Sequence, residues 1–154
     1  MEGARPAVAT DLGVIEALVA ELRDELIPMR GGLIWSLREA RENSDRAAFN
    51  ELLGEEASQI YVGTIDDTVI AVGTATVVAL HDGSKLGVIN ELFVTPGARA
   101  IGVGECLLEA LVEWCTAQKC IGIDALALPG HRATKNFFEG AGFTARSITM
   151  HTAL

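Results

Sequence analysis

The chain has 154 residues, of which 12 are basic and 21 acidic, so its net charge is −9, and 49% of its residues are hydrophobic. This length suits one packed domain covering residues 1–154. The negative charge argues against nucleic-acid binding by phosphate neutralisation, and no apolar run is long enough to cross a bilayer, so neither nucleic acid nor a membrane is an expected partner.

The first part of the chain is predicted to be mainly helical. Residues 5–9 are short and extended, and Thr10-Asp11 can then cap a helix. A helix over residues 11–27 is predicted because apolar residues recur at helical spacing, at Ile15, Leu18, Val19, Leu22 and Leu26. The apolar Leu33-Ile34-Trp35 stretch is placed in or beside a loop. Ser44-Asp45 can cap a second helix.

The pattern then changes to strands. Residues 60–65 and 69–78 are rich in β-branched side chains and flank Asp66-Asp67, which predicts a hairpin. The elements expected after it are a strand at 86–94, a helix at 102–115, a strand at 121–128, a helix at 133–139 and a last strand at 143–152. This order predicts an α/β (α+β) fold, with a mixed central sheet of about six to seven strands and helices on both faces.

The most informative segment joins the 86–94 strand to the next helix. It reads Arg99-Ala-Ile-Gly102-Val-Gly104. Such a loop can aim several backbone N–H groups at one point, and the helix N-terminus adds the positive end of its dipole. The loop therefore predicts a pyrophosphate site. No Lys-Ser or Lys-Thr follows it, which argues against a P-loop, and the third glycine of a dinucleotide fingerprint is missing.

This segment resembles motif A of the GNAT superfamily of acyl-coenzyme-A-dependent N-acyltransferases. In that motif a strand ends in Val, and Gln/Arg-x-x-Gly-x-Gly/Ala follows at the start of a helix, as Val94 and Arg99–Gly104 do here. Residues 137–143, Phe-Phe-Glu-Gly-Ala-Gly-Phe, resemble motif B. The resemblance covers nearly the whole chain. It implies a GNAT fold and an enzyme that transfers an acetyl group from acetyl-CoA to an amine, without a metal.

The resemblance also implies roles for individual residues. Backbone groups of Phe93 and Val94 would bind the pantetheine arm, and the Val94 N–H would donate to the thioester oxygen as a catalytic group. The residues implied to hold the pyrophosphate are Arg99, Ala100, Gly102, Val103 and Gly104. Glu91 lies where family members often carry an acid that removes a proton from the amine; a solvated strand residue or a salt-bridge partner is the equally weighted alternative.

Motif B departs from the family at Phe138, where many members have a Tyr that protonates the departing thiolate. The only tyrosine is Tyr61, in an early strand. His131 stands where the motif often opens with Asn; it contacts coenzyme A, acts as an acid or base, or is simply a polar loop residue. Asn136 is the other candidate for an amide contact with the cofactor. The missing tyrosine raises an alternative function, a catalytically silent acyl-CoA-binding or regulatory module.

The acceptor has no motif of its own. Between Asp11 and Glu56 there are eleven acidic and five basic residues, in the half with which this superfamily builds the acceptor side. The expected acceptor is a small-molecule or peptide amine. The acidic residues favour a cationic acceptor, but a solvated acidic surface is the commoner explanation of such a bias. The three cysteines and the absence of a leader pattern predict a cytoplasmic protein with reduced thiols, and the resemblance adds a homodimer as an expectation.

Overall fold

The computed structural model describes all residues, 1–154, and its five strands form one sheet in the order β1-β2-β3-β4-β5. Strands β1 to β4 are antiparallel to their neighbours, whereas β5 runs parallel to β4. The strands are β1 (Glu2–Pro6), β2 (Ser58–Ile65), β3 (Thr68–Ala79), β4 (Lys85–Val94) and β5 (Gly122–Ala125). The mixed sheet confirms the predicted class, but five strands replace the predicted six to seven.

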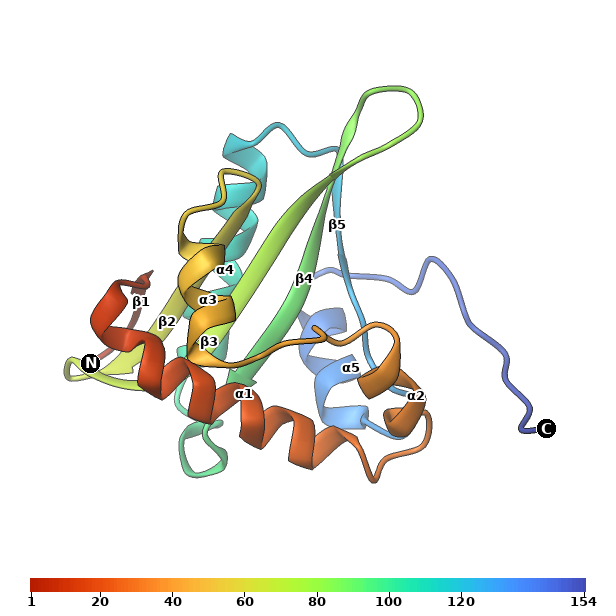
Figure 1. Cartoon of the computed structure of the whole chain (residues 1–154), viewed down its shortest axis with the longest axis horizontal. Helices are drawn as coiled ribbons and strands as arrows, with labels where there is room; N and C mark the ends of the chain where they lie inside the picture. Colours follow the sequence, from red (N-terminus) through yellow and green to blue (C-terminus); the bar gives the residue numbers. More distant parts are fainter.

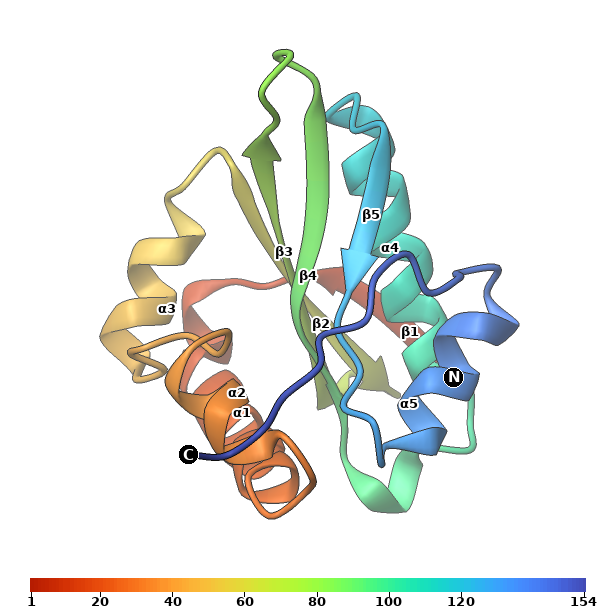
Figure 2. The same ribbon diagram turned by 90° about the vertical axis from the view of Figure 1, so that its right-hand side faces the viewer.

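Helices cover both faces of this sheet (Figures 1 and 2). α1 (Leu12–Leu26), α2 (Gly32–Leu37) and α3 (Arg46–Leu53) lie on one side, whereas α4 (Val103–Ala117) and α5 (Arg132–Gly140) lie on the other. Two short 3-10 turns, Ala9–Asp11 and Pro96–Ala98, precede α1 and follow β4. The predicted arrangement of helices on both faces is therefore confirmed.

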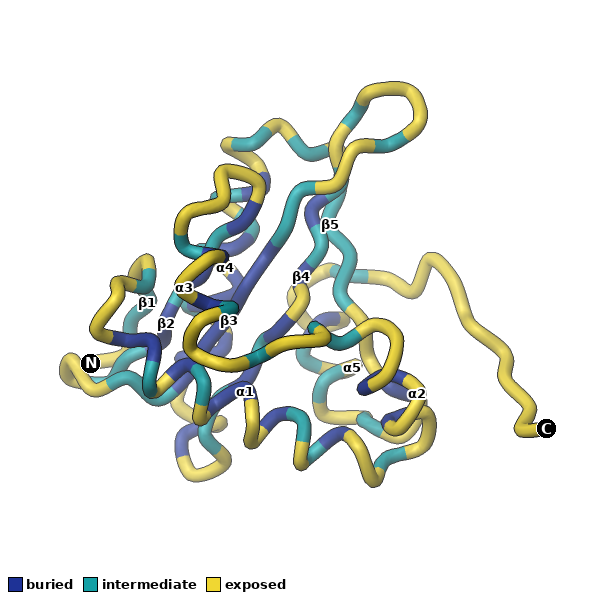
Figure 3. The backbone as a smooth tube through the Cα atoms, viewed as in Figure 1, coloured by how far each residue is buried: buried dark blue, intermediate teal, exposed yellow.

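Each face of the sheet has its own apolar core (Figure 3). On the α1 face, Phe49 and Ile15 are completely buried against Val62 and Val72. On the α4 face, the main buried residues come from the helix, among them Val103, Leu107, Leu111 and Cys115. α4 packs very closely, because a β-carbon at Gly63 would lie 2.5 Å from the Val103 side chain.

A β-bulge at Asn90 changes the phase of β4. Thr74 pairs with Glu91, but the next residue of β3, Ala75, pairs with Ile89, so Asn90 is the extra residue. Ile89 therefore packs in the α4-side core, while Glu91 lies on the same face as Thr74. A bulge of this kind re-aims the side chains that follow it, and here it brings a carboxylate to the α1 face.

The structure corrects two predictions. The Leu33-Ile34-Trp35 stretch lies within α2 rather than in a loop; Gly32 lets this helix pack tightly, since a β-carbon there would lie 1.8 Å from the Leu26 carbonyl oxygen. The predicted strand at 143–152 is wrong: this segment is extended and almost wholly exposed, because it pairs with no neighbouring strand. None of the helices combines the length and the apolar composition that crossing a membrane requires.

Candidate active site

A cavity opens where β4 and β5 part. Residues Leu86–Ile89 of β4 pair with Gly122–Ala125 of β5. Beyond this point β4 continues to Val94 with β3 as its only neighbouring strand. The cavity has a volume of about 250 Å³. Its walls come from the free half of β4, from α1 and α2, from the start of α4 and from α5, and include Leu22, Glu25, Trp35, Asn90, Glu91, Leu92, Phe93, Val94, Arg99, Gly104, His131, Phe137 and Phe138.

The backbone of β4 presents unused polar groups to this cavity. The Thr95 N–H donates to the Ile70 carbonyl of β3 at 2.9 Å. Because successive N–H groups of a strand point in opposite directions, those of Leu92 and Val94 point away from β3, toward the side that β5 has left. The backbone N–H of Phe93 turns toward β3 instead, and its buried side chain packs against α1. The backbone N–H of Leu92, rather than that of Phe93, therefore points to the side where the motif suggested a contact with the pantetheine arm.

The glycine-rich loop forms the N-terminus of α4. Gly102 is the N-cap residue at φ 87°, and no side chain caps the helix. The first-turn N–H groups, including those of Val103 and Gly104, therefore have no intrahelical partner. The Val103 side chain is completely buried, so only its backbone is available to a ligand. Gly104 lines the cavity; a β-carbon there would lie 3.3 Å from the Phe137 ring. Ala100 is exposed and does not line it.

Arg99 folds back over the end of β4. Its Nε donates to the Val94 carbonyl at 2.9 Å, and its guanidinium lies 5.1 Å from the centre of the Phe93 ring. Its Nη2 lies 2.8 Å from the Glu25 carboxylate of α1. Arg99 thus ties the glycine-rich loop to β4 and α1. Glu25 is a cavity residue that the sequence did not single out.

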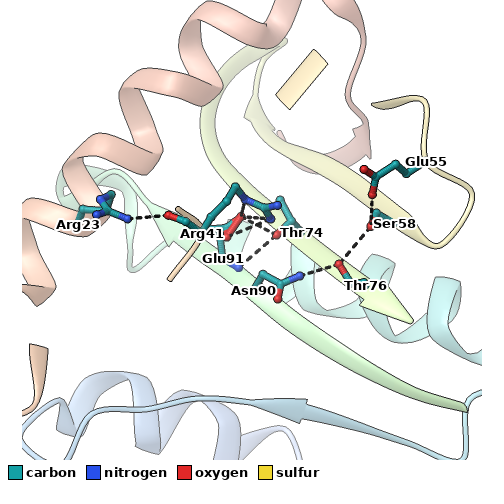
Figure 4. Close-up of polar contacts among 8 residues, drawn as sticks. All are labelled: Arg23, Arg41, Glu55, Ser58, Thr74, Thr76, Asn90 and Glu91. Carbon is teal, nitrogen blue, oxygen red and sulfur yellow. Dashed lines mark hydrogen bonds and ion pairs between the residues drawn. The ribbon is translucent and has the colours of Figure 1, made fainter. Parts of the chain in front are cut away.

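Glu91 is 5% exposed and forms part of a polar cluster (Figure 4). Its Oε1 accepts hydrogen bonds from Arg41 Nε (3.1 Å), Arg41 Nη2 (2.7 Å) and Thr74 Oγ1 (3.0 Å). Its Oε2 has only a 3.4 Å contact with Arg41 Nη2. Arg41 also lies 5.4 Å from the centre of the Phe49 ring. The carboxylate is therefore held through one oxygen, which leaves the other largely free to interact with a ligand.

The residues predicted in α5 and at its N-cap divide into two groups. His131 and Phe138 line the cavity, with the His131 Nδ1 3.0 Å from the Thr134 hydroxyl. Asn136 lies on the exposed side of the helix, outside the cavity. Tyr61 packs against the α4-side cores, where burial raises the pKa of its hydroxyl, and it is not a cavity residue either. No tyrosine hydroxyl therefore lines the cavity.

Comparison with known proteins identifies the family of the chain and relatives of its fold. A profile of the acetyltransferase (GNAT) family matches residues 16–143, whereas a search of curated proteins finds no match. The BH1408 protein from Bacillus halodurans is similar in structure, in a tetramutant form, with a TM-score of 0.81 and 20% identity over 98% of this chain and 99% of that one.

Two similar structures carry enzyme names. Glucosamine-6-phosphate N-acetyltransferase from Arabidopsis thaliana has a TM-score of 0.73 and 18% identity, over 99% of this chain and 98% of that one. AAC(6')-Iy, in complex with the bisubstrate analog CoA-S-monomethyl-acetylneamine, has a TM-score of 0.76 and 18% identity, over 100% of this chain and 98% of that one. At these identities the structures show the fold. Since the family profile also covers most of the sequence, the chain belongs to the GNAT acetyltransferase family.

Proposed function

We propose that the protein transfers an acetyl group from acetyl-CoA to a primary amine. The observation that carries this proposal is the opening between β4 and β5. One continuous cavity there has unpaired strand amides along one wall, the start of α4 at one end and the Glu91 carboxylate on its α1 side. A thioester cofactor needs the strand amides and the helix N-terminus, and an amine acceptor needs the carboxylate.

The residues of the chain fit coenzyme A. An extended pantetheine arm can pair with the free edge of β4 as an added strand. Its pyrophosphate can accept hydrogen bonds from the first-turn N–H groups of α4, where Gly102 and Gly104 let phosphate oxygens come close. Arg99, being tied to Val94 and Glu25, would support this loop. Ala100 and Asn136 remain predictions for the outer parts of the cofactor site.

Glu91 is the proposed general base. An aliphatic amine is almost fully protonated at neutral pH, so a group of the enzyme must accept its proton before attack on the thioester. Glu91 Oε2 is the oxygen left largely uncommitted, because Arg41 and Thr74 both bind Oε1. The proton would pass to Oε2 directly or through one water.

The backbone N–H groups of Leu92 and Val94 are the proposed donors to the thioester oxygen. Fixed donors of this kind stabilise the negative charge that develops on the oxygen during attack. The thiolate then leaves. A thiol with a pKa of about 8.5 is an acceptable leaving group without a protein acid, which agrees with a buried Phe138 in place of a tyrosine. His131, which lines the same cavity, is the only imidazole there.

The test is release of free thiol from acetyl-CoA in the presence of a panel of amines. The panel includes polyamines, aminoglycosides, amino acids and peptide N-termini. Turnover of at least one amine, with the acetylated product identified by mass spectrometry, is the expected result. Tight coenzyme A binding without turnover of any amine would contradict the proposal and favour the catalytically silent alternative. A homodimer and a cytoplasmic location stay predictions.

A further inference from the structure

A second, more open cavity lies beside the first on the α1 face. It has a volume of about 190 Å³ and is lined by Glu39, Arg41, Thr76, Val78, Val88 and Asn90. Asn90 lines both cavities, and Arg41 of the second is bonded to Glu91 of the first. A molecule with one end at Glu91 can therefore extend over Asn90 into the second cavity.

The charge of the second cavity is negative once its contacts are considered. Arg41 is committed to Glu91 through two nitrogen atoms. Glu39 is the other charged residue of the lining; it is exposed and forms no ion pair. An unpaired carboxylate beside a neutralised arginine attracts a cation.

The uncharged groups of the second cavity favour a hydrogen-bond donor attached to an apolar chain. Asn90 donates its side-chain N–H to Thr76 Oγ1 at 2.8 Å, which leaves the Asn90 side-chain oxygen as an acceptor (Figure 4). Thr76 Oγ1 also lies 3.1 Å from the Ser58 hydroxyl, so its own bonding is largely satisfied. Val78 and Val88 supply apolar walls. The free acceptors are therefore Glu39 and Asn90, and they lie beside two valines.

We infer that the second cavity binds a second ammonium group of the acceptor, so that the acceptor is a diamine or longer polyamine with an aliphatic spacer. This inference rests on the proposed function. One amine lies at Glu91 for acetylation, the methylene spacer crosses Asn90 between Val78 and Val88, and the distal ammonium faces Glu39. The bulge in β4 is what makes this path continuous, since it puts Asn90 and Glu91 on the same face.

The experiment compares Glu39→Gln with Glu42→Gln. Both substitutions remove one exposed carboxylate from the same loop, but Glu42 lines neither cavity. Steady-state kinetics are measured with 1,4-diaminobutane and 1,6-diaminohexane and with the matching monoamines, 1-aminobutane and 1-aminohexane. The wild type is expected to prefer the diamines. Glu39→Gln should raise KM for the better diamine about two- to fivefold, the range for one exposed ion pair, with kcat and the monoamine constants unchanged.

Three results would each overturn the inference and leave the proposed function standing. The first is a wild type that acetylates monoamines as well as it does diamines. The second is an equal effect of Glu39→Gln on both classes of amine, and the third is the same effect from Glu42→Gln. If no amine is acetylated, the proposed function fails, and the second cavity is then tested by calorimetry with 1,4-diaminobutane in the presence of coenzyme A. Equal affinity of wild type and Glu39→Gln would refute the diamine site there too.

Discussion

The glycine-rich loop allows a test of the cofactor site in which charge is separated from backbone strain. Gly102 has φ 87°, so any side chain at this position is strained. Asn and Asp tolerate the left-handed region best and have the same shape. The informative comparison is therefore Gly102→Asp with Gly102→Asn, which share the strain and differ by one negative charge.

The magnitude follows from Coulomb's law. Two unit charges about 6 Å apart repel each other by about 0.7 kcal/mol in bulk water and by about 2.8 kcal/mol at an effective dielectric constant of about 20. Coenzyme A should therefore bind about threefold to about 100-fold more weakly to Gly102→Asp than to Gly102→Asn. The difference should shrink in high salt, because mobile ions screen surface charges.

The assay is isothermal titration calorimetry with coenzyme A. A β-carbon at Gly102 would lie 3.7 Å from the Glu2 carboxylate, so both variants are made in a Glu2→Gln background, which keeps the new carboxylate from meeting the old one. Thermal unfolding confirms that both variants are folded. Equal affinities for coenzyme A in these two folded variants would refute the assignment of the pyrophosphate to this loop.

Three further substitutions test the proposed base, the ion pair between Arg5 and Asp11, and the packing of α4. Glu91→Gln should lower the rate about ten- to a thousandfold at neutral pH and recover partly at high pH, where the amine is already free; a wild-type pH–rate profile would remove Glu91 from the mechanism. The hydrogen bond from Arg5 keeps the pKa of Asp11 below its ordinary value, so its contribution to stability is complete above the unfolded pKa of about 3.9 and is lost as the pH falls through the folded pKa. Asp11→Asn should thus lower the free energy of unfolding at pH 7, measured by urea denaturation, by about 1–3 kcal/mol. The difference from wild type should shrink below about pH 4. A difference that does not depend on pH would count against the ion pair. Gly63→Ala, whose new methyl group would lie 2.5 Å from Val103, should lower stability by about 1–3 kcal/mol in the same assay, and an unchanged urea midpoint would show that α4 can shift at little cost.

Local sequence patterns predicted those parts of the site that are built by neighbouring residues. The strand, turn and helix around Arg99–Gly104 form one continuous segment, so spacing alone located the loop. The contact of Arg41 with Glu91 joins residues fifty positions apart, and no periodicity in either segment signals it. The positive charge of Arg41 is balanced by Glu91 in the structure, which its position in the sequence does not reveal.

The same limit explains the errors in the fold. Residues 143–152 were predicted to form a last strand, but a strand also requires a neighbour with free backbone groups, and the sequence of the segment does not show whether one is available. α2 was missed because the position of Gly32 against the Leu26 carbonyl, rather than helical periodicity, allows a short helix to form there. The acidic bias of the first half was visible from composition, whereas the position of Glu39 beside a cavity required the fold.

The bulge in β4 means that this strand can lose one residue without exchanging its faces. Side chains along a strand alternate between its two faces, so a shift of one residue in a regular strand exchanges them. Here Thr74 already pairs with Glu91 and Ala75 with Ile89, so removing Asn90 would join the two registers into one regular ladder, with Glu91 still on the α1 face and Leu92 still on the α4 face. The deletion would instead remove the local bend of the strand and the side chain that lines both cavities. A relative that lacks this residue should therefore keep the carboxylate of the first cavity and lose its connection to the second.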